Sequence, residues 1–361
     1  MIASDGLIER QDALLIAKKI LAALIHPFQI EDHEFFISAS IGIAIHLLDA
    51  TEAEDLIRHA DRAMYQAKGQ GLGYQFYHSE LENLSERVTL ENDLRRALER
   101  DELQLYYQPK VALATGAVIG LEALLRWMHP TSGMISPDQF IPLAEETGII
   151  IPIGEWVLRK ACLQIKCWQQ AGLSIPVSVN LSTHQFRQFT TTAEIDRRAT
   201  AGKPPNYLVE TVERVLEETQ IDPSCLELEI TESILMQNLS MAVATLQALS
   251  SKGIRISIDD FGTGYSSLSY IKRLPIHTIK IDKTFVGDIS TDQDDAAIVS
   301  AIIAMAHSLR LKVVAEGVET QEQFDFLLNQ GCDAMQGFFF SKPLPADETL
   351  ALLQREIFRH S

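Results

Sequence analysis

The stretch Arg255–Leu268, which reads RISIDDFGTGYSSL, decides the fold and the candidate site. Its opening residues alternate between isoleucine and polar residues, a pattern typical of a half-buried strand. The strand is predicted to end at two adjacent acids, Asp259 and Asp260, and a glycine-rich loop follows. Neighbouring side chains of a strand point to opposite faces, so two carboxylates serve one site best where the backbone turns. The pattern indicates a site for hard cations, although an isolated pair of this kind is also typical of a solvated turn.

Composition describes an ordinary globular protein. The chain has 361 residues, of which 46% are hydrophobic and 22% charged, enough for two or three domains. No apolar run approaches the roughly 18 residues of a membrane span, and Met1–Arg10 lacks the features of a signal peptide. The cysteines show no zinc spacing, and Cys162 and Cys167 are expected to be buried free thiols. We therefore expect a cytoplasmic location.

The net charge of −18 argues against a DNA-binding surface and against contact with an anionic membrane. An acidic protein can still bind phosphate esters when divalent cations and a few arginine or lysine residues reverse the local field. The sequence should then gather carboxylates and a few cationic side chains at one place.

Residues 1–79 form the first predicted unit, with helices over Asp12–Leu24 and Ala53–Ala67 and strands over Phe35–Ala44 and Tyr74–Tyr77. Two helices and two strands bury little apolar surface, so this unit is not expected to be stable alone. Its open strand edges favour pairing with a partner or incomplete order. A polar helix over residues 80–100 is predicted to connect it to the next domain.

Three segments of this first unit resemble the C-terminal half of a GGDEF diguanylate cyclase domain: Ser40–Ala44 (SIGIA), Ala60–Gly71 (ADRAMYQAKGQG) and Tyr74–Tyr77. The Gly-Gly-Asp-Glu-Phe signature that carries the chemistry of that family occurs nowhere in the chain. We therefore predict no cyclase activity and interpret 1–79 as a truncated remnant.

Residues 101–361 alternate between strand-like and helical segments, which predicts parallel βαβ units. The strands are expected at Leu103–Val111, Val118–Leu125, Val177–Asn180, Leu226–Ile230, Arg255–Asp259, Thr278–Ile281, Lys312–Ala315 and Ala334–Phe338, and the longer helices at Ile153–Ala171, Leu239–Lys252, Asp292–Leu309 and Gln321–Asn329. A Thr115-Gly116 turn makes the first two strands antiparallel. About eight strands in roughly 250 residues indicate an α/β fold of the TIM-barrel kind with an irregular opening, and a doubly wound open sheet is the alternative.

Polar residues are predicted at the C-terminal ends of successive strands, which converge on one mouth in a barrel. They are Glu122 and Arg126, Asn180, Glu229 and Glu232, Asp259 and Asp260, Lys280 and Asp282, Glu316, and Gln336 near the last strand. Each has an ordinary explanation alone, such as an edge charge, a turn former or a helix cap. Their recurrence on strand after strand favours a shared site.

These side chains offer oxygen ligands without a His or Cys cluster, which favours Mg²⁺ or Mn²⁺ over zinc. Adjacent Asp residues with further carboxylates suit two ions roughly 4 Å apart, as in phosphoryl-ester hydrolysis. Lys280 could orient or help deprotonate an attacking water, or neutralise phosphate charge, and Arg126 is suited to a phosphate oxygen.

The same positions resemble the EAL domain of cyclic-di-GMP phosphodiesterases over about 250 residues. The matching motifs are Glu122-Ala123-Leu124 with Arg126, Asn180-Leu181-Ser182, Glu229-Ile230-Thr231-Glu232, Asp259–Leu268, Lys280-Ile281-Asp282, Glu316-Gly317-Val318-Glu319 and Gln336-Gly337. The resemblance implies a modified TIM (β/α)8 barrel with an antiparallel first strand. It also implies hydrolysis of cyclic di-GMP to linear 5′-pGpG with two Mg²⁺ or Mn²⁺ ions.

The resemblance also implies roles for individual residues. One ion would be held by Glu122, Asn180, Glu229 and Asp259, and Asp259 would bridge to a second ion held by Asp260. Lys280 would act on the nucleophilic water, supported by Glu316 and Gln336. Glu232 would anchor the Asp260–Ser267 loop, which the family uses to couple homodimer formation to metal binding. Substrate contacts would come from Gln108, Leu124, Arg126, Asp282, Glu319 and Gln336.

One segment departs from the family pattern. Residues 189–207 (FTTTAEIDRRATAGKPPNY) are polar and are interpreted as a surface insertion on the catalytic side, where they could gate substrate entry or disturb a dimer. The alternative function is a catalytically inactive cyclic-di-GMP receptor or scaffold. Such receptors typically lack a metal ligand, and this chain lacks none.

Overall fold

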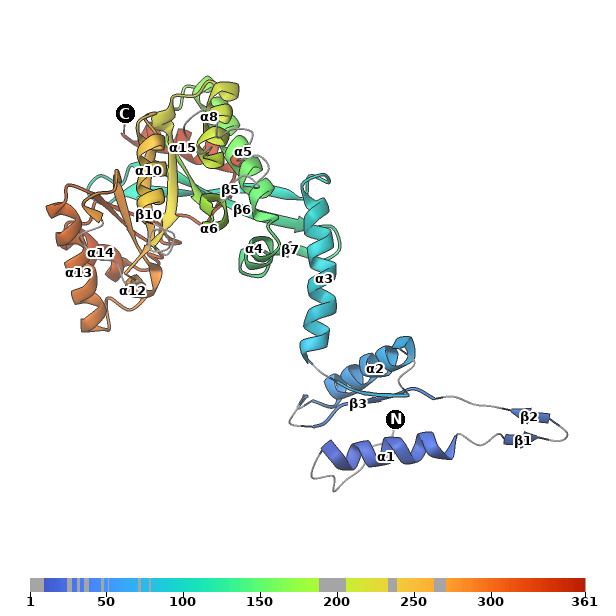
Figure 1. Ribbon diagram of the computed structural model, residues 1–361. Coiled ribbons are helices and arrows are strands. Elements are labelled where there is room, and N and C mark those ends of the chain that lie inside the picture. The colour runs from blue at the N-terminus through green and yellow to red at the C-terminus, as the bar shows by residue number, and fades with distance from the viewer. Residues whose placement is uncertain are drawn as a thin grey trace. The chain divides into compact units, whose positions relative to one another are not determined.

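The computed structural model describes residues 10–24, 28–30, 33–35, 39–46, 49–50, 52–70, 73–77, 79–187, 206–232, 239–262 and 271–360. The chain divides into two compact units, Met1–Leu90 and Glu91–Ser361 (Figure 1). The predicted insertion at 189–207 lies outside the described residues except for its last two positions, and the Tyr265–Ser267 part of the loop after Asp260 also lies outside them.

In the described residues before the connecting helix, the first unit contains α1 (Arg10–Ala23), β1 (Phe28–Ile30), β2 (His33–Phe35), β3 (Ile41–Ile43), α2 (Ala53–Gln70) and β4 (Tyr74–Phe76). β1 pairs with β2 antiparallel, and β3 pairs with β4 parallel. The continuous strand predicted over Phe35–Ala44 is wrong, because residues 39–40 lie outside β3. A Cβ atom on Gly42 would lie 1.9 Å from the carbonyl oxygen of Ala60, so glycine allows α2 to pack closely on β3.

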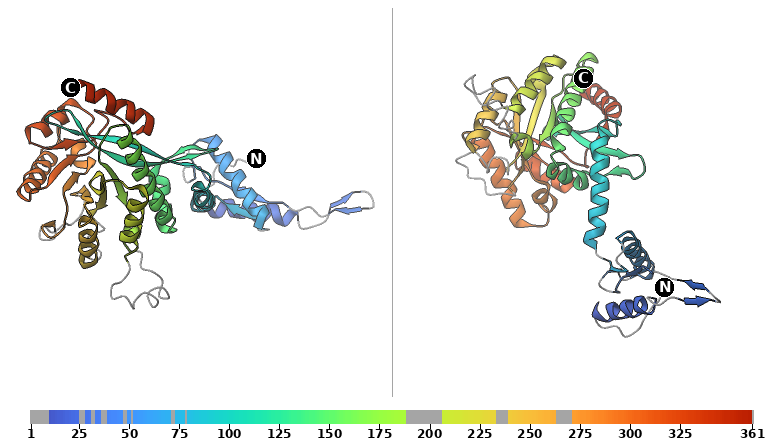
Figure 2. Two further views of the ribbon diagram at one scale, coloured as in Figure 1. Left: turned by 90° about the horizontal axis from the view of Figure 1, so that it is seen from above. Right: turned by 45° about the vertical axis from the view of Figure 1, so that its right-hand side comes forward.

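The connecting helix α3 (Ser79–Ala97) leads into the second unit. The barrel strands there are β5 (Leu103–Ala112), β6 (Val118–His129), β8 (Val177–Leu181), β9 (Leu226–Thr231), β10 (Arg255–Phe261), β11 (Thr278–Ile281), β12 (Lys312–Ala315) and β13 (Ala334–Met335), with β7 (Gly133–Ile135) and β14 (Leu344–Pro345) added at the margins. β5 pairs with both β6 and β13, which closes the eight-stranded barrel (Figure 2). The pairings of β5 with β6 and β13 are antiparallel, whereas the strands from β6 through β13 run parallel in the closed ring. The predicted barrel with an antiparallel first strand is confirmed, and the open-sheet alternative is wrong.

Helices follow the strands and surround the barrel in Figures 1 and 2. They are α4 (Pro137–Glu146), α5 (Ile150–Gln170), α6 (Thr183–Arg187), α8 (Tyr207–Thr219), α10 (Leu239–Ser250), α12 (Lys283–Gly287), α13 (Gln293–Ser308), α14 (Gln321–Asn329) and α15 (Ala346–His360), with a 3-10 turn at Pro223–Cys225. α14 starts at a capping box, in which Thr320 and Gln323 satisfy each other's backbone N–H groups.

The barrel strands are buried on both faces, and the two faces differ in chemistry. In β9, Leu228 and Ile230 are fully buried and alternate with Glu227 and Glu229, because successive side chains point to opposite sides of a strand. Burial of each large aliphatic side chain contributes about 1.5–3 kcal/mol. The outward row therefore supplies the apolar core, and the inward row places charged groups inside the barrel.

The two cysteines of α5 differ in exposure. Cys162 is buried as predicted, but Cys167 is exposed, because it occupies a solvent-facing position of α5. None of the helices in the described residues combines the length and apolar character that crossing a bilayer requires.

Candidate active site

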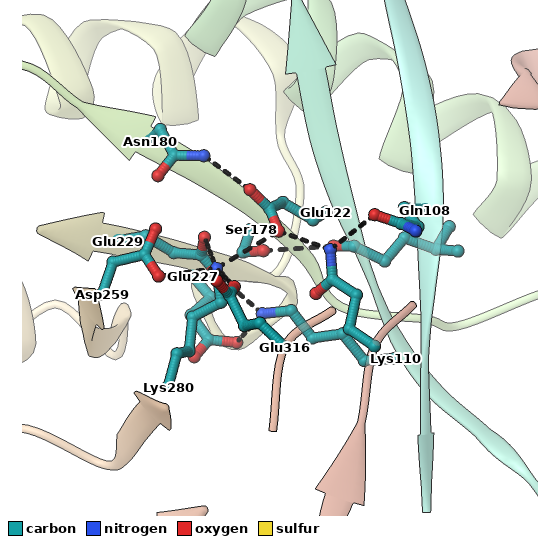
Figure 3. Close-up of polar contacts among 12 residues, drawn as sticks. Gln108, Lys110, Glu122, Ser178, Asn180, Glu227, Glu229, Asp259, Lys280 and Glu316 are labelled. Atoms are coloured by element: carbon teal, nitrogen blue, oxygen red, sulfur yellow. Dashed lines mark hydrogen bonds and ion pairs between the residues drawn. The ribbon is translucent and has the colours of Figure 1, made fainter. Parts of the chain in front are cut away.

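Lys280 lies at the centre of the polar barrel interior. Its side chain extends from β11 and is completely buried. Its Nζ atom lies 3.2 Å from Glu122 Oε2, 2.6 Å from Glu229 Oε2, 3.0 Å from Asp259 Oδ1 and 2.5 Å from Glu316 Oε1 (Figure 3). These acids come from β6, β9, β10 and the residue after β12. The closed sheet thus brings together residues that are far apart in sequence.

The carboxylates around Lys280 fall into two overlapping groups. One oxygen from each of Glu122, Glu229 and Asp259 lies within 4.8 Å of the others, and the same holds for Asp259, Asp260 and Glu316. We call these five residues the acid cluster. Their donor atoms are all hard oxygens, the ligands of Mg²⁺ and Mn²⁺. Because Asp259 belongs to both groups, the residues present fit a pair of divalent cations that share one carboxylate.

The backbone at Asp260 explains how two adjacent acids reach one site. Asp260 has a positive φ of 53°, which an Asp side chain tolerates better than most residues. The pairing of β10 with β11 is irregular between Ile258 and Phe261. The predicted strand end at Asp259 is therefore wrong: β10 continues to Phe261 through a bulge that redirects Asp260. Gly262 follows at φ 105°, where a Cβ atom would lie 2.8 Å from the Phe285 ring.

Burial and ion pairing shift the protonation equilibria of the acid cluster in opposite directions. Burial disfavours the charged form of Glu229, but its ion pairs with Lys110 and Lys280 outweigh burial and lower its pKa to about 2. Burial and the nearby Asp259 and Glu122 raise the pKa of Glu316 to about 8, against the opposing effect of Lys280. The surrounding acids also hold the pKa of Lys280 well above its ordinary value despite its burial.

The second part of the cluster is less fully ionised. Burial, Asp259 and a hydrogen-bonded Asp282 raise the pKa of Asp260 to about 6. Burial and then Glu229 raise the pKa of Glu122. The site therefore holds both ionised and proton-retaining carboxylates near neutral pH, a combination suited to acid–base chemistry.

Amide side chains connect the cluster to the barrel wall. Asn180 Nδ2 donates to Glu122 Oε1 at 2.7 Å, and Gln336 Nε2 donates to Glu122 Oε2 at 2.6 Å and to Gln108 Oε1 at 3.0 Å. Gln108 in turn donates to the carbonyl oxygen of Ser341. Each oxygen of Glu122 thus accepts from a neutral amide, and Oε2 also accepts from Lys280.

The other predicted residues lie around this centre. Asp282 caps α12 by accepting from the Thr284 N–H, and Glu232 Oε2 accepts from the Gly262 N–H at 3.4 Å. Leu124 and Arg126 follow Glu122 on the same side of β6, and Arg126 stacks over the Tyr106 ring at 5.7 Å. Glu319 is exposed, before α14. The hydrogen bonds and ion pairs described here do not join Leu124, Arg126 or Glu319 to the acid cluster.

The structure changes the expected depth of the site and adds residues to it. Glu122 lies in the middle of β6, so the prediction that it ends a strand is wrong; Glu229 likewise precedes the end of β9. Sequence reasoning missed Lys110, whose Nζ lies 2.6 Å from Glu229 Oε1, and Glu227, whose Oε2 lies 3.6 Å from that Nζ. Each of these residues lies two positions from a predicted site residue in the same strand, as in Gln108-Pro109-Lys110 and Glu227-Leu228-Glu229. Side chains two positions apart point to the same face of a strand, so this spacing could have identified them.

Comparison with known protein families agrees with the geometry. The EAL domain model matches residues 91–343, and the model of the diguanylate cyclase GGDEF domain matches residues 4–73. The chain belongs to the EAL domain family and carries a partial GGDEF domain before it.

Several curated proteins resemble almost the whole chain. A bifunctional diguanylate cyclase/cyclic di-GMP phosphodiesterase, MucR of Pseudomonas aeruginosa, is 48% identical over 95% of the chain. The signaling protein YkoW of Bacillus subtilis is 41% identical over 96%, and the cyclic di-GMP phosphodiesterase PdeR of Escherichia coli is 39% identical over 92%. The chain spans only 48%, 42% and 48% of the lengths of these three relatives, respectively.

Solved structures show the same barrel. The MucR phosphodiesterase in complex with c-di-GMP is 49% identical, with a TM-score of 0.66 over 72% of this chain and 99% of that one. The EAL domain of Mycobacterium smegmatis DcpA is 34% identical, with a TM-score of 0.56 over 70% of this chain and 98% of that one.

Proposed function

We propose that this protein hydrolyses cyclic di-GMP to linear 5′-pGpG in a reaction that depends on two Mg²⁺ or Mn²⁺ ions. The observation that carries the proposal is that two sets of three acidic residues, both of which include Asp259, lie around the buried Lys280. The names of the relatives support the substrate, because MucR and PdeR are both described as cyclic di-GMP phosphodiesterases. A MucR structure contains c-di-GMP.

The charges of the site support two divalent cations. When all are ionised, the five acids of the cluster and Glu227 carry six negative charges, and Lys280 and Lys110 carry two positive ones, which leaves four excess negative charges that two divalent ions would neutralise. Glu122, Asn180, Glu229 and Asp259 would hold one ion, and Asp259 and Asp260 the other. When bound, such ions polarise a phosphate oxygen and lower the pKa of an attacking water.

The chain's own groups then have separable tasks. Lys280 would orient the attacking water and offset phosphate charge from its fixed position among the acids. Glu316, with its raised pKa, is suited to take up or hold a proton beside Lys280. Attack at phosphorus breaks the bond to a ribose 3′ oxygen, which opens the cyclic dinucleotide.

Substrate recognition would come from residues around the mouth of the barrel. The Arg126 guanidinium suits a phosphate oxygen, and Gln108, Leu124, Asp282, Glu319 and Gln336 would complete the contacts. We further propose that the protein acts in the cytoplasm as a homodimer formed by the EAL domain. We propose that residues 1–79 form the GGDEF-like remnant, residues 80–100 the connecting helix and residues 101–361 the EAL barrel.

The test is a turnover assay with the purified protein and cyclic di-GMP in Mg²⁺, in Mn²⁺ and in EDTA, with pGpG measured by chromatography. Hydrolysis in either metal and none in EDTA is expected. Binding of cyclic di-GMP without turnover in both metals would instead establish the inactive receptor, and absence of both binding and turnover would refute the substrate.

A further inference from the structure

A second buried lysine lies inside the barrel, outside the motifs that define the site. Lys110 extends from β5, and its side chain is about 5% exposed. Its Nζ donates to Glu229 Oε1 at 2.6 Å, while Lys280 Nζ donates to Glu229 Oε2, also at 2.6 Å (Figure 3). The two oxygens of Glu229 are therefore held by two different lysines from two different strands.

The two lysines differ in what else they contact. Lys280 lies near four carboxylates, so it can give up one contact and keep the others. Lys110 forms ion pairs with Glu229 and Glu227, both on β9, and the Lys110–Glu227 separation is the longer at 3.6 Å. A short bond to Glu229 Oε1 is thus the main contact of the Lys110 ammonium. When a cation takes Glu229 as a ligand, Oε2 is the oxygen that becomes available.

We propose that Lys110 is a positioning residue that occupies Oε1 and restricts Glu229 to a single-oxygen ligand, and that the site thereby favours small divalent cations over Ca²⁺. The inference rests on the proposed metal-dependent function. Ca²⁺ takes six to eight oxygen ligands and readily accepts both oxygens of a carboxylate, whereas Mg²⁺ requires six ligands in a tight octahedron. A carboxylate with one oxygen already bonded suits the smaller ion.

The test replaces Lys110 by methionine, which retains the length of the apolar stem and removes the ammonium group. Dissociation constants for Mn²⁺ and Ca²⁺ are measured by titration calorimetry on the whole protein without substrate. Loss of an outer-sphere partner typically weakens metal affinity by about 10–100-fold. Because released Glu229 can offer both oxygens to Ca²⁺, the preference for Mn²⁺ over Ca²⁺ should fall by about tenfold or more in Lys110→Met.

Two further variants isolate the effect. Glu227→Gln removes a charge beside Lys110 but leaves the Lys110–Glu229 bond, so its Mn²⁺/Ca²⁺ preference should change less than that of Lys110→Met. The double variant Lys110→Met with Glu227→Gln removes the lysine together with a carboxylate that it compensates. It should show the same loss of preference even where the single variant folds poorly.

The outcomes are separable. The assignment of Lys110 would be overturned if the double variant kept the wild-type preference for Mn²⁺ over Ca²⁺, or if it lost affinity for both ions equally. Either result would leave the proposed metal-dependent hydrolysis intact. A wild-type protein that binds neither ion would overturn this inference together with the proposed function.

Discussion

The side chains of Gln336 and Glu122, 214 residues apart in the chain, are joined by a hydrogen bond of 2.6 Å. The bond runs between the residue that follows β13 and the middle of β6, and both strands flank β5 in the closed ring. The side chains that meet where β5 closes the barrel therefore also orient a candidate metal ligand.

Replacing Gln336 by alanine should weaken metal binding. Glu122 Oε2 would lose its amide donor, and loss of such a partner typically costs about 10–100-fold in affinity. Titration calorimetry with Mn²⁺ measures the effect. Gln330→Ala, at an exposed position after α14, is the matched control and should bind as the wild type does. Equal affinities for the two variants would contradict the role given to Gln336.

Replacing Lys280 by methionine should abolish most turnover and also destabilise the metal-free protein. Removing a catalytic acid–base or positioning group typically lowers the rate by about 10²–10⁴-fold. Removing one partner of a buried ion pair costs about 3–5 kcal/mol, because the acids left behind lack a counter-charge. Rates of pGpG formation and urea unfolding curves measure the two effects.

Added Mn²⁺ provides an internal check on this variant. A divalent ion can replace the missing positive charge, so Mn²⁺ should raise the urea midpoint of Lys280→Met by more than it raises that of the wild type. Lys252→Met, which removes a partly exposed lysine paired with Glu213, is the control and should change neither property. Wild-type rates from Lys280→Met would refute the assignment.

Glu232 provides a test of the segment after Asp260. Its Oε2 accepts the Gly262 N–H, and an amide oxygen can replace this acceptor. Glu232→Ala should therefore lower kcat/KM by roughly tenfold through displacement of Asp260, whereas Glu232→Gln should stay near the wild type. Indistinguishable steady-state kinetics of these two variants would show that the hydrogen bond does not matter.

Asp333 predicts a pH dependence of stability away from the candidate site. Burial tends to raise its pKa, but hydrogen bonds from Lys312, His307 and the Val313 N–H outweigh burial and lower it. A depressed folded-state pKa stabilises the fold above the unfolded-state value, and this contribution disappears as the pH falls through the folded-state value.

The Asp333→Asn variant should therefore be less stable than the wild type at pH 7. The difference is expected to be about 1 kcal/mol or less, because Lys312 is largely exposed and solvent screens the pair. The gap between the two proteins should shrink as the pH falls below about 4. Urea unfolding at several pH values measures the difference in the free energy of unfolding between the two proteins. A difference that is constant with pH would rule out the Asp333 charge as its cause.

The sequence was sufficient where a signal was local. The strands β11 and β12 have the predicted bounds because each is a short apolar segment that an acidic residue, Asp282 or Glu316, follows directly. β6 is longer than predicted, since its last residues pair with the short strand β7, which carries few strand-forming residues. Such pairing depends on partners that a local pattern does not contain.

The same limit applies to the site. Motifs located Glu122, Glu229 and Lys280, but the role of Lys110 depends on an ion pair with Glu229, 119 residues further along the chain. The positive φ of Asp260 was also beyond local reasoning, because it arises from a bulge in the β10–β11 ladder. Both are consequences of tertiary structure.

Because β5 runs antiparallel to β6, the Thr115-Gly116 turn between them influences which side chains of β5 face the polar interior. The hairpin register places Gln108 opposite Glu122 and Lys110 opposite Gly120, and this register depends on the turn together with the irregularity of the pairing between Lys110 and Val111. If one residue more or less in the turn shifted the hairpin register by one position, Pro109 and Val111 would point into the barrel instead of Gln108 and Lys110. A turn at the opposite end of the barrel thus helps to align the polar interior, and we expect a change in its length to weaken metal binding as strongly as loss of a candidate ligand does.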